Sequence, residues 1–139
     1  MGLLQELYQH TIIDHDRRPR NYGEPASYSH SQEGLNPSCG DEVTLYLQVE
    51  DGQVRGASFV GQGCAISRAA ASMMTGAVRG RSVTEALELA GKFRTMIHGG
   101  EVDPALGDLQ ALQGVSQLHA RVKCATLPWV TLEQALTAA

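Results

Sequence analysis

Residues 43–59, VTLYLQVEDGQVRGASF, decide the fold because they have the pattern of two strands joined by a tight turn. Apolar residues occupy every second position of the first strand: Val43, Leu45, Leu47 and Val49. Asp51-Gly52 is a strong hairpin signal, since a two-residue turn needs residues that accept a positive φ. In the second strand the alternation slips by one residue, and we expect a bulge at Gly56 to absorb the slip.

Two turns flank this hairpin, and each contains a cysteine. Asn36-Pro37-Ser38-Cys39-Gly40-Asp41 precedes the first strand, and Gly61-Gln62-Gly63-Cys64 follows the second. Antiparallel pairing brings both turns to the same end of the sheet. Asn-Pro initiates a turn and Gly40 permits a positive φ, so Cys39 and Asp41 can converge on one point. We expect a shared metal ion there, although a single cysteine by itself is more often a small buried hydrophobe.

Helical patterns cover most of the remaining chain. Apolar residues at three- and four-residue spacing predict helices over these stretches: about Leu3 to Asp14, with Leu4, Leu7 and Tyr8 on its apolar face, and Ala65 to Val78 directly after Cys64. A capping box of Ser82 and Glu85 begins another helix that ends at Gly99-Gly100. Pro128 near the first turn marks the last helix.

The other segments are predicted as connections. Residues 24–35 are rich in Ser, Gly and Pro and have the composition of a mobile loop. Residues 101–117 are expected to hold one short helix around Leu109 to Leu112. Arg17, Arg18 and Arg20 form either a solvated basic loop or a contact for an acidic partner surface.

Composition limits the possible functions. At 139 residues the chain is long enough for one domain with a core, so we expect residues 1–139 to form a single domain. A net charge of -4 argues against a general nucleic-acid binder, and no apolar run approaches the length of a membrane span. The N-terminus lacks the pattern of a secretory signal, so a cytoplasmic protein is expected. The three cysteines are an odd number and cannot close a disulfide framework.

The surroundings of the cysteines favour metal binding or thiol chemistry. Cys64 precedes a helix, whose exposed amide groups favour a thiolate. Cys124 is also expected near a helix start, and Arg121 and Lys123 add positive charge beside it. The Gly61-Gln62-Gly63 loop lacks the Lys-Ser/Thr ending of a phosphate-binding P-loop.

Three thiolates and the Asp41 carboxylate are enough to close a tetrahedral zinc site. The same thiolates would equally hold part of an iron–sulfur cluster. The intervals between the cysteines, 25 and 60 residues, match no short zinc-finger pattern, so spacing does not decide between these sites. A purely structural zinc site in an interaction module is a further alternative.

The sequence resembles the SufU and IscU group of iron–sulfur cluster assembly proteins over nearly its whole length, and the SufU branch more closely. In combination the matching motifs are highly specific. They are Leu7-Tyr8, Asp14-His15 through Pro19-Arg20-Asn21, Asn36-Pro37-Ser38-Cys39-Gly40-Asp41, Phe59 through Ser67, Ala71-Ser72-Met73-Met74-Thr75, Ala111-Leu112-Gln113-Gly114-Val115 and Arg121-Val122-Lys123-Cys124-Ala125.

The resemblance implies an α+β fold, with a small antiparallel β-sheet and helices packed on one face. It implies a metal site made of Cys39, Asp41, Cys64 and Cys124. In the IscU branch these positions hold a nascent [2Fe-2S] cluster, with a His before the last Cys. Here Lys123 stands at that position.

The chaperone motif Leu-Pro-Pro-Val-Lys of the IscU branch is also missing from this sequence, and residues 101–117 correspond to an insertion typical of SufU. These differences favour the SufU role. In that role a Zn²⁺-bound protein accepts sulfur from a SufS-like cysteine desulfurase as a sulfurtransferase, and cluster scaffolds or apo-proteins would be the next acceptors.

Within this role, Cys39 is the expected sulfur acceptor. Of the three cysteines, it is expected to lie in the most mobile segment, the turn that contains Gly40. A side chain of the desulfurase would replace Cys39 on the zinc, and Arg121 would stabilise or orient the released thiolate. The histidines, His10, His15, His30, His98 and His119, are expected at the surface or at caps, and only His119 is close enough in sequence to Cys124 to merit a test as a ligand.

Overall fold

The computed structural model describes the backbone of residues 3–38 and 40–137, and side chains from residue 10 onward within those ranges. Cys39 lies outside the described residues, as do the side chains of Leu3, Leu4, Leu7 and Tyr8, on which the first helix was predicted. The elements follow in the order α1 (Leu3–Arg17), β1 (His30–Asn36), β2 (Asp41–Glu50), β3 (Gln53–Gln62), α2 (Ala65–Val78), α3 (Val83–Ile97), the 3₁₀ segment η1 (Pro104–Gln117) and α4 (His119–Thr137).

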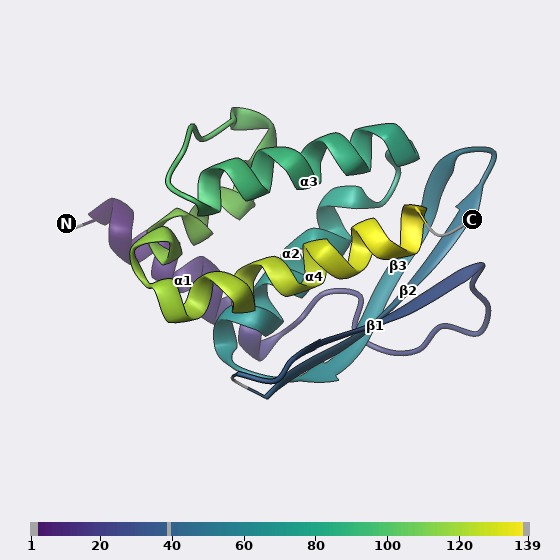
Figure 1. The fold of residues 1–139 in the computed structure, drawn as a ribbon, viewed down its shortest axis with the longest axis horizontal. Helices are drawn as coiled ribbons and strands as arrows, with labels where there is room; N and C mark the ends of the chain where they lie inside the picture. The colour runs from purple at the N-terminus through teal and green to yellow at the C-terminus, as the bar shows by residue number, and fades with distance from the viewer. Residues whose placement is uncertain (1–2, 39, 138–139) are drawn as a thin grey trace.

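Three antiparallel strands in the order β1-β2-β3 form the sheet. α4 packs on β1 and β2, and α2 packs on β3, while α3 contacts α4 and η1 and lies farther from the sheet (Figure 1). The predicted α+β class, with helices on one face of a small antiparallel sheet, is confirmed. No helix in the described part of the chain is long and apolar enough to cross a membrane.

The β2–β3 hairpin agrees with the sequence pattern. Asp51 and Gly52 have φ values of 52° and 73°, which is the left-handed pair that a type I′ turn requires. The predicted bulge is present, but Arg55 is the extra residue, because Gln48 pairs with Gly56 while Val49 pairs with Val54. This extra residue lets both Val54 and Ala57 point into the core despite their odd spacing.

Strand β1 corrects the prediction of a mobile loop over residues 24–35. Its sequence, HSQEGLN, has little intrinsic strand preference, and the strand forms because β2 offers an unpaired edge. The buried Gly34 lies beneath α4, where a Cβ atom would come within 2.1 Å of the Thr131 hydroxyl oxygen. Long-range contacts therefore hold β1 in the sheet, and the sequence of β1 alone does not predict them.

The predicted α2 helix and the capping box of α3 are confirmed. Cys64 is the N-cap of α2, and the Ser82 hydroxyl accepts the Glu85 N–H while the Glu85 carboxylate accepts the Ser82 N–H. Met73 and Met74 are buried core residues, as predicted. The α1 helix runs three residues beyond the predicted end at Asp14.

Two predictions near the C-terminus were wrong. α4 begins at His119, so Cys124 lies in its second turn and Pro128 lies inside the helix. Pro128 is buried inside the helix. The next residue, Trp129, stacks on Phe93 with 5.3 Å between ring centroids.

The short helix expected at Leu109 to Leu112 is instead the longer 3₁₀ segment η1, which is broken at Gly107. After the break, buried residues recur every third position at Leu109, Leu112 and Val115, and Ala111 is buried as well. A 3₁₀ helix has three residues per turn, so this spacing places Leu109, Leu112 and Val115 on one face.

Candidate metal centre

Three of the four predicted ligands come together although they are distant in the sequence. Asp41 is the first residue of β2, Cys64 caps α2, and Cys124 lies in α4. One carboxylate oxygen of Asp41 and the two Sγ atoms all lie within 4.8 Å of one another. Cys39, the fourth predicted ligand, lies outside the described residues.

The hairpin brings Asp41 beside Cys64. Glu42 at the start of β2 pairs with Gln62 at the end of β3, so the loop after β3 begins next to Asp41. The Cys64 N–H donates a hydrogen bond to Asp41 Oδ1 at 2.9 Å. A Cβ atom at Gly63 would lie 2.4 Å from the same oxygen, so this approach requires glycine.

The start of α2 stabilises negative charge at Cys64. Its Sγ atom accepts a hydrogen bond from the Ser67 N–H, with 3.5 Å between the two atoms. The free amide groups and the positive end of the helix dipole lie at the same end of α2 as this sulfur. Cys64 is partly exposed, so this sulfur remains accessible from one side.

The surroundings of Cys124 match the prediction in part: Arg121 lies beside it, but the helix start does not. Cys124 is completely buried, and it lies away from the start of its helix, so the helix dipole contributes little there. Arg121 lies three residues earlier, on the same face of α4. The pKa of the Arg121 guanidinium is raised above its ordinary value, first by a hydrogen bond to Cys124 and then by the charges of Cys64 and Cys124.

Cys124 and Asp41 are 0% and 1% exposed, so solvent does not reach the site from their side. Arg121 is exposed, and the rim of the site on its side is open to solvent. The rim is formed by Cys64 and Arg121. A cation entering from this side meets two sulfur atoms and a carboxylate that already face one another, and a guanidinium lies at the edge.

These donors fit a small divalent ion. Zinc takes thiolate and carboxylate ligands in tetrahedral geometry, with sulfur about 2.3 Å from the metal, which puts neighbouring ligand atoms roughly 3.8 Å apart. The separations of up to 4.8 Å between Asp41, Cys64 and Cys124 are close to this spacing. The role of these residues as metal ligands stays a prediction.

Other residues named from the sequence do not belong to the group of three gathered ligands. His119 is exposed and is not among the His, Cys, Asp and Glu groups that gather at the described ligands. Lys123 is exposed on α4. His15, expected at the surface or at a cap, is half-buried, and its Nδ1 atom lies 2.7 Å from the Ser72 hydroxyl oxygen.

The sequence did not predict the close approach of Gly63 to Asp41 or the hydrogen bond from Ser67 to Cys64. A glycine directly before a capping cysteine was the available signal for Gly63, because such a position often marks a close backbone approach. Ser67 gave no signal, since it contributes only its backbone N–H.

Comparison with known proteins shows the family of the chain. The family described as NifU-like N terminal domain matches residues 7–138. The chain belongs to this family. The predicted resemblance to the SufU and IscU group is therefore confirmed, and the matched region includes all four predicted ligand positions.

Relatives in the NifU-like N-terminal domain family cover nearly the whole chain. The Bacillus subtilis protein named zinc-dependent sulfurtransferase SufU is 44% identical over 94% of this chain and 90% of its own length. The Streptococcus pyogenes protein named iron–sulfur cluster assembly scaffold protein IscU is 40% identical over 98% of this chain and 86% of its own length. The crystal structure of SufU from Fervidobacterium islandicum AW-1 has a TM-score of 0.89 at 36% identity, covering 96% of this chain and 98% of that chain.

Proposed function

We propose that this chain is a zinc-dependent sulfur acceptor in iron–sulfur cluster assembly and that a cysteine desulfurase supplies the sulfur. The observation that carries the proposal is the convergence of Asp41, Cys64 and Cys124 within 4.8 Å, with Cys39 two residues before Asp41 in the sequence. The name of the Bacillus subtilis relative, zinc-dependent sulfurtransferase, supports it.

Zn²⁺ bound by Cys39, Asp41, Cys64 and Cys124 would keep the thiols deprotonated near neutral pH without redox chemistry that would consume a persulfide. The chain holds three of these donors firmly. Cys64 is fixed by its N-cap position and Asp41 by the Cys64 N–H, while Cys124 is buried within α4. These contacts suit residues that keep their positions throughout the reaction.

Cys39 is the proposed acceptor. It lies in the sequence between β1 and β2, next to Gly40, whose φ of 71° belongs to the left-handed region. Its thiolate would attack the outer sulfur of the desulfurase persulfide. A new S–S bond forms to Cys39, the S–S bond on the desulfurase breaks, and its cysteine leaves as a thiolate while the proton stays on the transferred sulfur.

Arg121 has a role of its own at this step. Its exposed guanidinium lies at the rim beside Cys64 and Cys124 and bears a permanent positive charge. We assign it to stabilising the Cys39 thiolate before attack, through charge-assisted hydrogen bonds.

The test is Cys39→Ala in an assay of alanine formation by the desulfurase, with mass spectrometry of the chain for one added sulfur atom. We expect that the variant no longer stimulates alanine formation by the desulfurase and no longer gains a sulfur atom. It should still bind zinc, at reduced affinity. Cys124→Ala is the matched comparison, because it should lose most of the zinc. Unchanged sulfur loading in Cys39→Ala would refute the assignment.

A cluster scaffold is the second candidate, and the Streptococcus pyogenes relative named IscU favours it. The same four residues would then hold a [2Fe-2S] cluster, which is passed to apo-proteins. Anaerobic reconstitution with iron and sulfide distinguishes the two functions. A scaffold becomes brown and transfers its cluster to an apo-ferredoxin, whereas a zinc-dependent acceptor retains zinc and stays colourless.

A further inference from the structure

A cavity of about 280 Å³ lies between α1, α2 and η1, away from the candidate metal centre. Ser72 and Gly76 of α2 form part of its wall. Ser72 comes eight residues after Cys64, which corresponds to about 12 Å along the helix at 1.5 Å per residue. His15 of α1, Arg81 of the connection between α2 and α3, and Asp108 of η1 line the same cavity.

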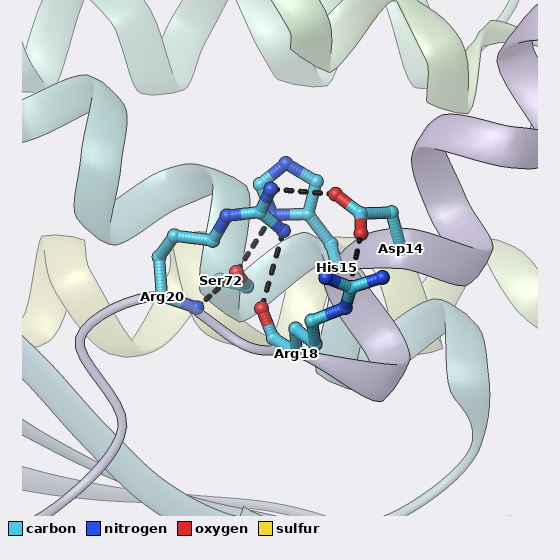
Figure 2. Close-up of polar contacts among 5 residues, drawn as sticks. All are labelled: Asp14, His15, Arg18, Arg20 and Ser72. Atoms are coloured by element: carbon cyan, nitrogen blue, oxygen red, sulfur yellow. Dashed lines mark hydrogen bonds and ion pairs between the residues drawn. The ribbon is translucent and has the colours of Figure 1, made fainter.

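His15, Arg20 and Ser72, which line the cavity, belong to a connected polar network that also includes Asp14 and Arg18 (Figure 2). The Ser72 hydroxyl oxygen accepts the Arg20 backbone N–H at 2.8 Å and lies 2.7 Å from His15 Nδ1. The Arg20 guanidinium donates to the Asp14 carboxylate at 2.5 Å and to the Arg18 carbonyl oxygen at 3.1 Å. The charges of Arg20 and Asp14 therefore compensate each other.

The network determines which nitrogen of His15 has the proton. Burial, together with the charge of Arg20, lowers the pKa of His15, so the neutral ring predominates near pH 7. We assign the Ser72 hydroxyl as the donor to His15 Nδ1, because its oxygen already accepts the Arg20 N–H and its proton has no other hydrogen-bond acceptor among the described residues. The proton of the ring is then on Nε2, which lies on the far side of the ring from Ser72 (Figure 2).

Three polar groups at the cavity retain hydrogen-bonding capacity. His15 Nε2 has no hydrogen-bond partner among the described residues. The Nε atom of Arg81 donates to the Ala77 carbonyl oxygen at 2.7 Å, but its two terminal nitrogens contact no acceptor in that part of the chain. Asp108 is exposed and likewise makes no hydrogen bond or ion pair with a described residue.

The charges select the ligand. Asp14 forms ion pairs with both Arg20 and Arg18, and the charge of the highly exposed Arg18 is screened by solvent. Arg81 and Asp108 have opposite charges and His15 is neutral, so a doubly charged anion gains little. A single carboxylate would receive hydrogen bonds from Arg81 and from His15 Nε2–H. The wall leaves room for such a group, because neither Gly76 nor Gly107 has any heavy atom within 4 Å of where a Cβ would stand.

We propose that this cavity binds the carboxylate group of a small molecule, with the Arg81 guanidinium and His15 Nε2 as the donors. The carboxylate belongs either to a simple organic acid or to a free amino acid. The ammonium group of an amino acid would donate a hydrogen bond to the Asp108 carboxylate. The inference stands independently of the proposed function, because it uses no residue of the metal centre.

The experiment is a ¹⁵N–¹H NMR titration of the zinc-loaded full chain with sodium acetate and, separately, with L-alanine. Sodium chloride at equal ionic strength is the blank. We expect saturable shifts at the amides of Gly76 and Gly107 and at His15 Nε2. Arg81→Gln should weaken binding by at least about tenfold. Arg55→Gln, which removes an equally charged but exposed arginine on β3, should leave it unchanged.

Gly76→Leu provides a second variant that keeps the charges and fills the space, and it should also abolish the shifts. Tighter binding of alanine than of acetate, lost in Asp108→Asn, would identify an amino acid, and equal binding would identify a simple acid. Shifts that match the chloride blank for both probes would overturn the proposal. Equal binding by Arg81→Gln and Arg55→Gln would also overturn it.

Discussion

The Oδ1 atom of Asp41 accepts a hydrogen bond from the backbone N–H of Cys64, with 2.9 Å between oxygen and nitrogen. This contact connects the first residue of β2 to the residue that caps α2. The carboxylate that is proposed to bind the metal thus also holds a second proposed ligand in place, so a change at Asp41 acts on both positions.

Asp41→Asn separates these two effects. The amide oxygen of Asn still accepts the Cys64 N–H, but the negative charge is lost, so we expect zinc affinity to fall by at least about tenfold. Asp41→Ala removes both contributions and should bind zinc more weakly still. The measurement is competition for zinc with a chromogenic chelator. Glu42→Gln, at the exposed neighbouring acid, is the control, and an equal affinity for Asp41→Asn and Glu42→Gln would contradict the prediction.

Gly63→Ala tests the close approach beside the metal centre. The new methyl group would lie 2.4 Å from Asp41 Oδ1 and has to displace the carboxylate or the loop. We expect a loss of about 1–3 kcal/mol in the free energy of unfolding, and weaker zinc binding, measured by urea denaturation and chelator competition.

The matched control is Gly91→Ala in α3, where no heavy atom lies within 4 Å of the added Cβ. Alanine has the higher helix propensity, so this variant should gain about 0.5–1 kcal/mol in the same free energy. Similar effects of both substitutions would show that Gly63 does not depend on its contact with Asp41.

Arg121→Gln tests the proposed role of the guanidinium in sulfur transfer. Arg121 contacts the cysteines from the exposed rim, so we expect zinc content to remain at one ion per chain while the rate of sulfur loading falls by at least about tenfold. Arg121→Lys should recover only part of the rate, because the ammonium group lacks the planar fork of donors. Lys123→Gln removes an exposed charge on the same helix and should leave both quantities unchanged. Zinc loss in Arg121→Gln would assign the residue to metal retention instead.

His15 should make stability depend on pH. Burial and the charge of Arg20 lower its pKa below the ordinary 6.5, while Asp14 and Asp108 oppose the shift. The unfolded chain then binds more protons at this residue, so its contribution to stability is complete above about pH 6.5 and is lost as the pH falls through the lower folded-state pKa.

We therefore expect the free energy of unfolding to fall more steeply in the wild type than in His15→Gln between about pH 7 and pH 5. Urea denaturation at several pH values measures this difference. His10→Gln, at an exposed histidine on the same helix, should follow the wild type. Parallel pH profiles for the wild type and His15→Gln would exclude the effect.

Local signals in the sequence predicted much of the fold. The β2–β3 turn, the bulge near Gly56 and the capping box of Ser82 depend on neighbouring residues, and all three are present. Cys64 could be assigned to a helix N-terminus for the same reason. The recurrence of buried residues every third position in η1 was also visible in the sequence, but the pattern of a 3₁₀ helix went unrecognised.

The remaining features depend on contacts between distant segments. β1 forms because β2 offers it an edge, and α4 starts early enough to bury Cys124 because it packs on α2 and β1. The contact between His15 and Ser72 spans 57 residues. No nearby sequence pattern encodes any of these three.

The sequence by itself determined the hairpin, most helices and the family, because turn geometry, periodicity and motif order are properties of short stretches. Only the tertiary structure decided that Asp41, Cys64 and Cys124 face one another and that a polar cavity opens between α1, α2 and η1. Those distances arise when separate elements bury their apolar faces together, and the burial of one segment depends on all the segments that cover it.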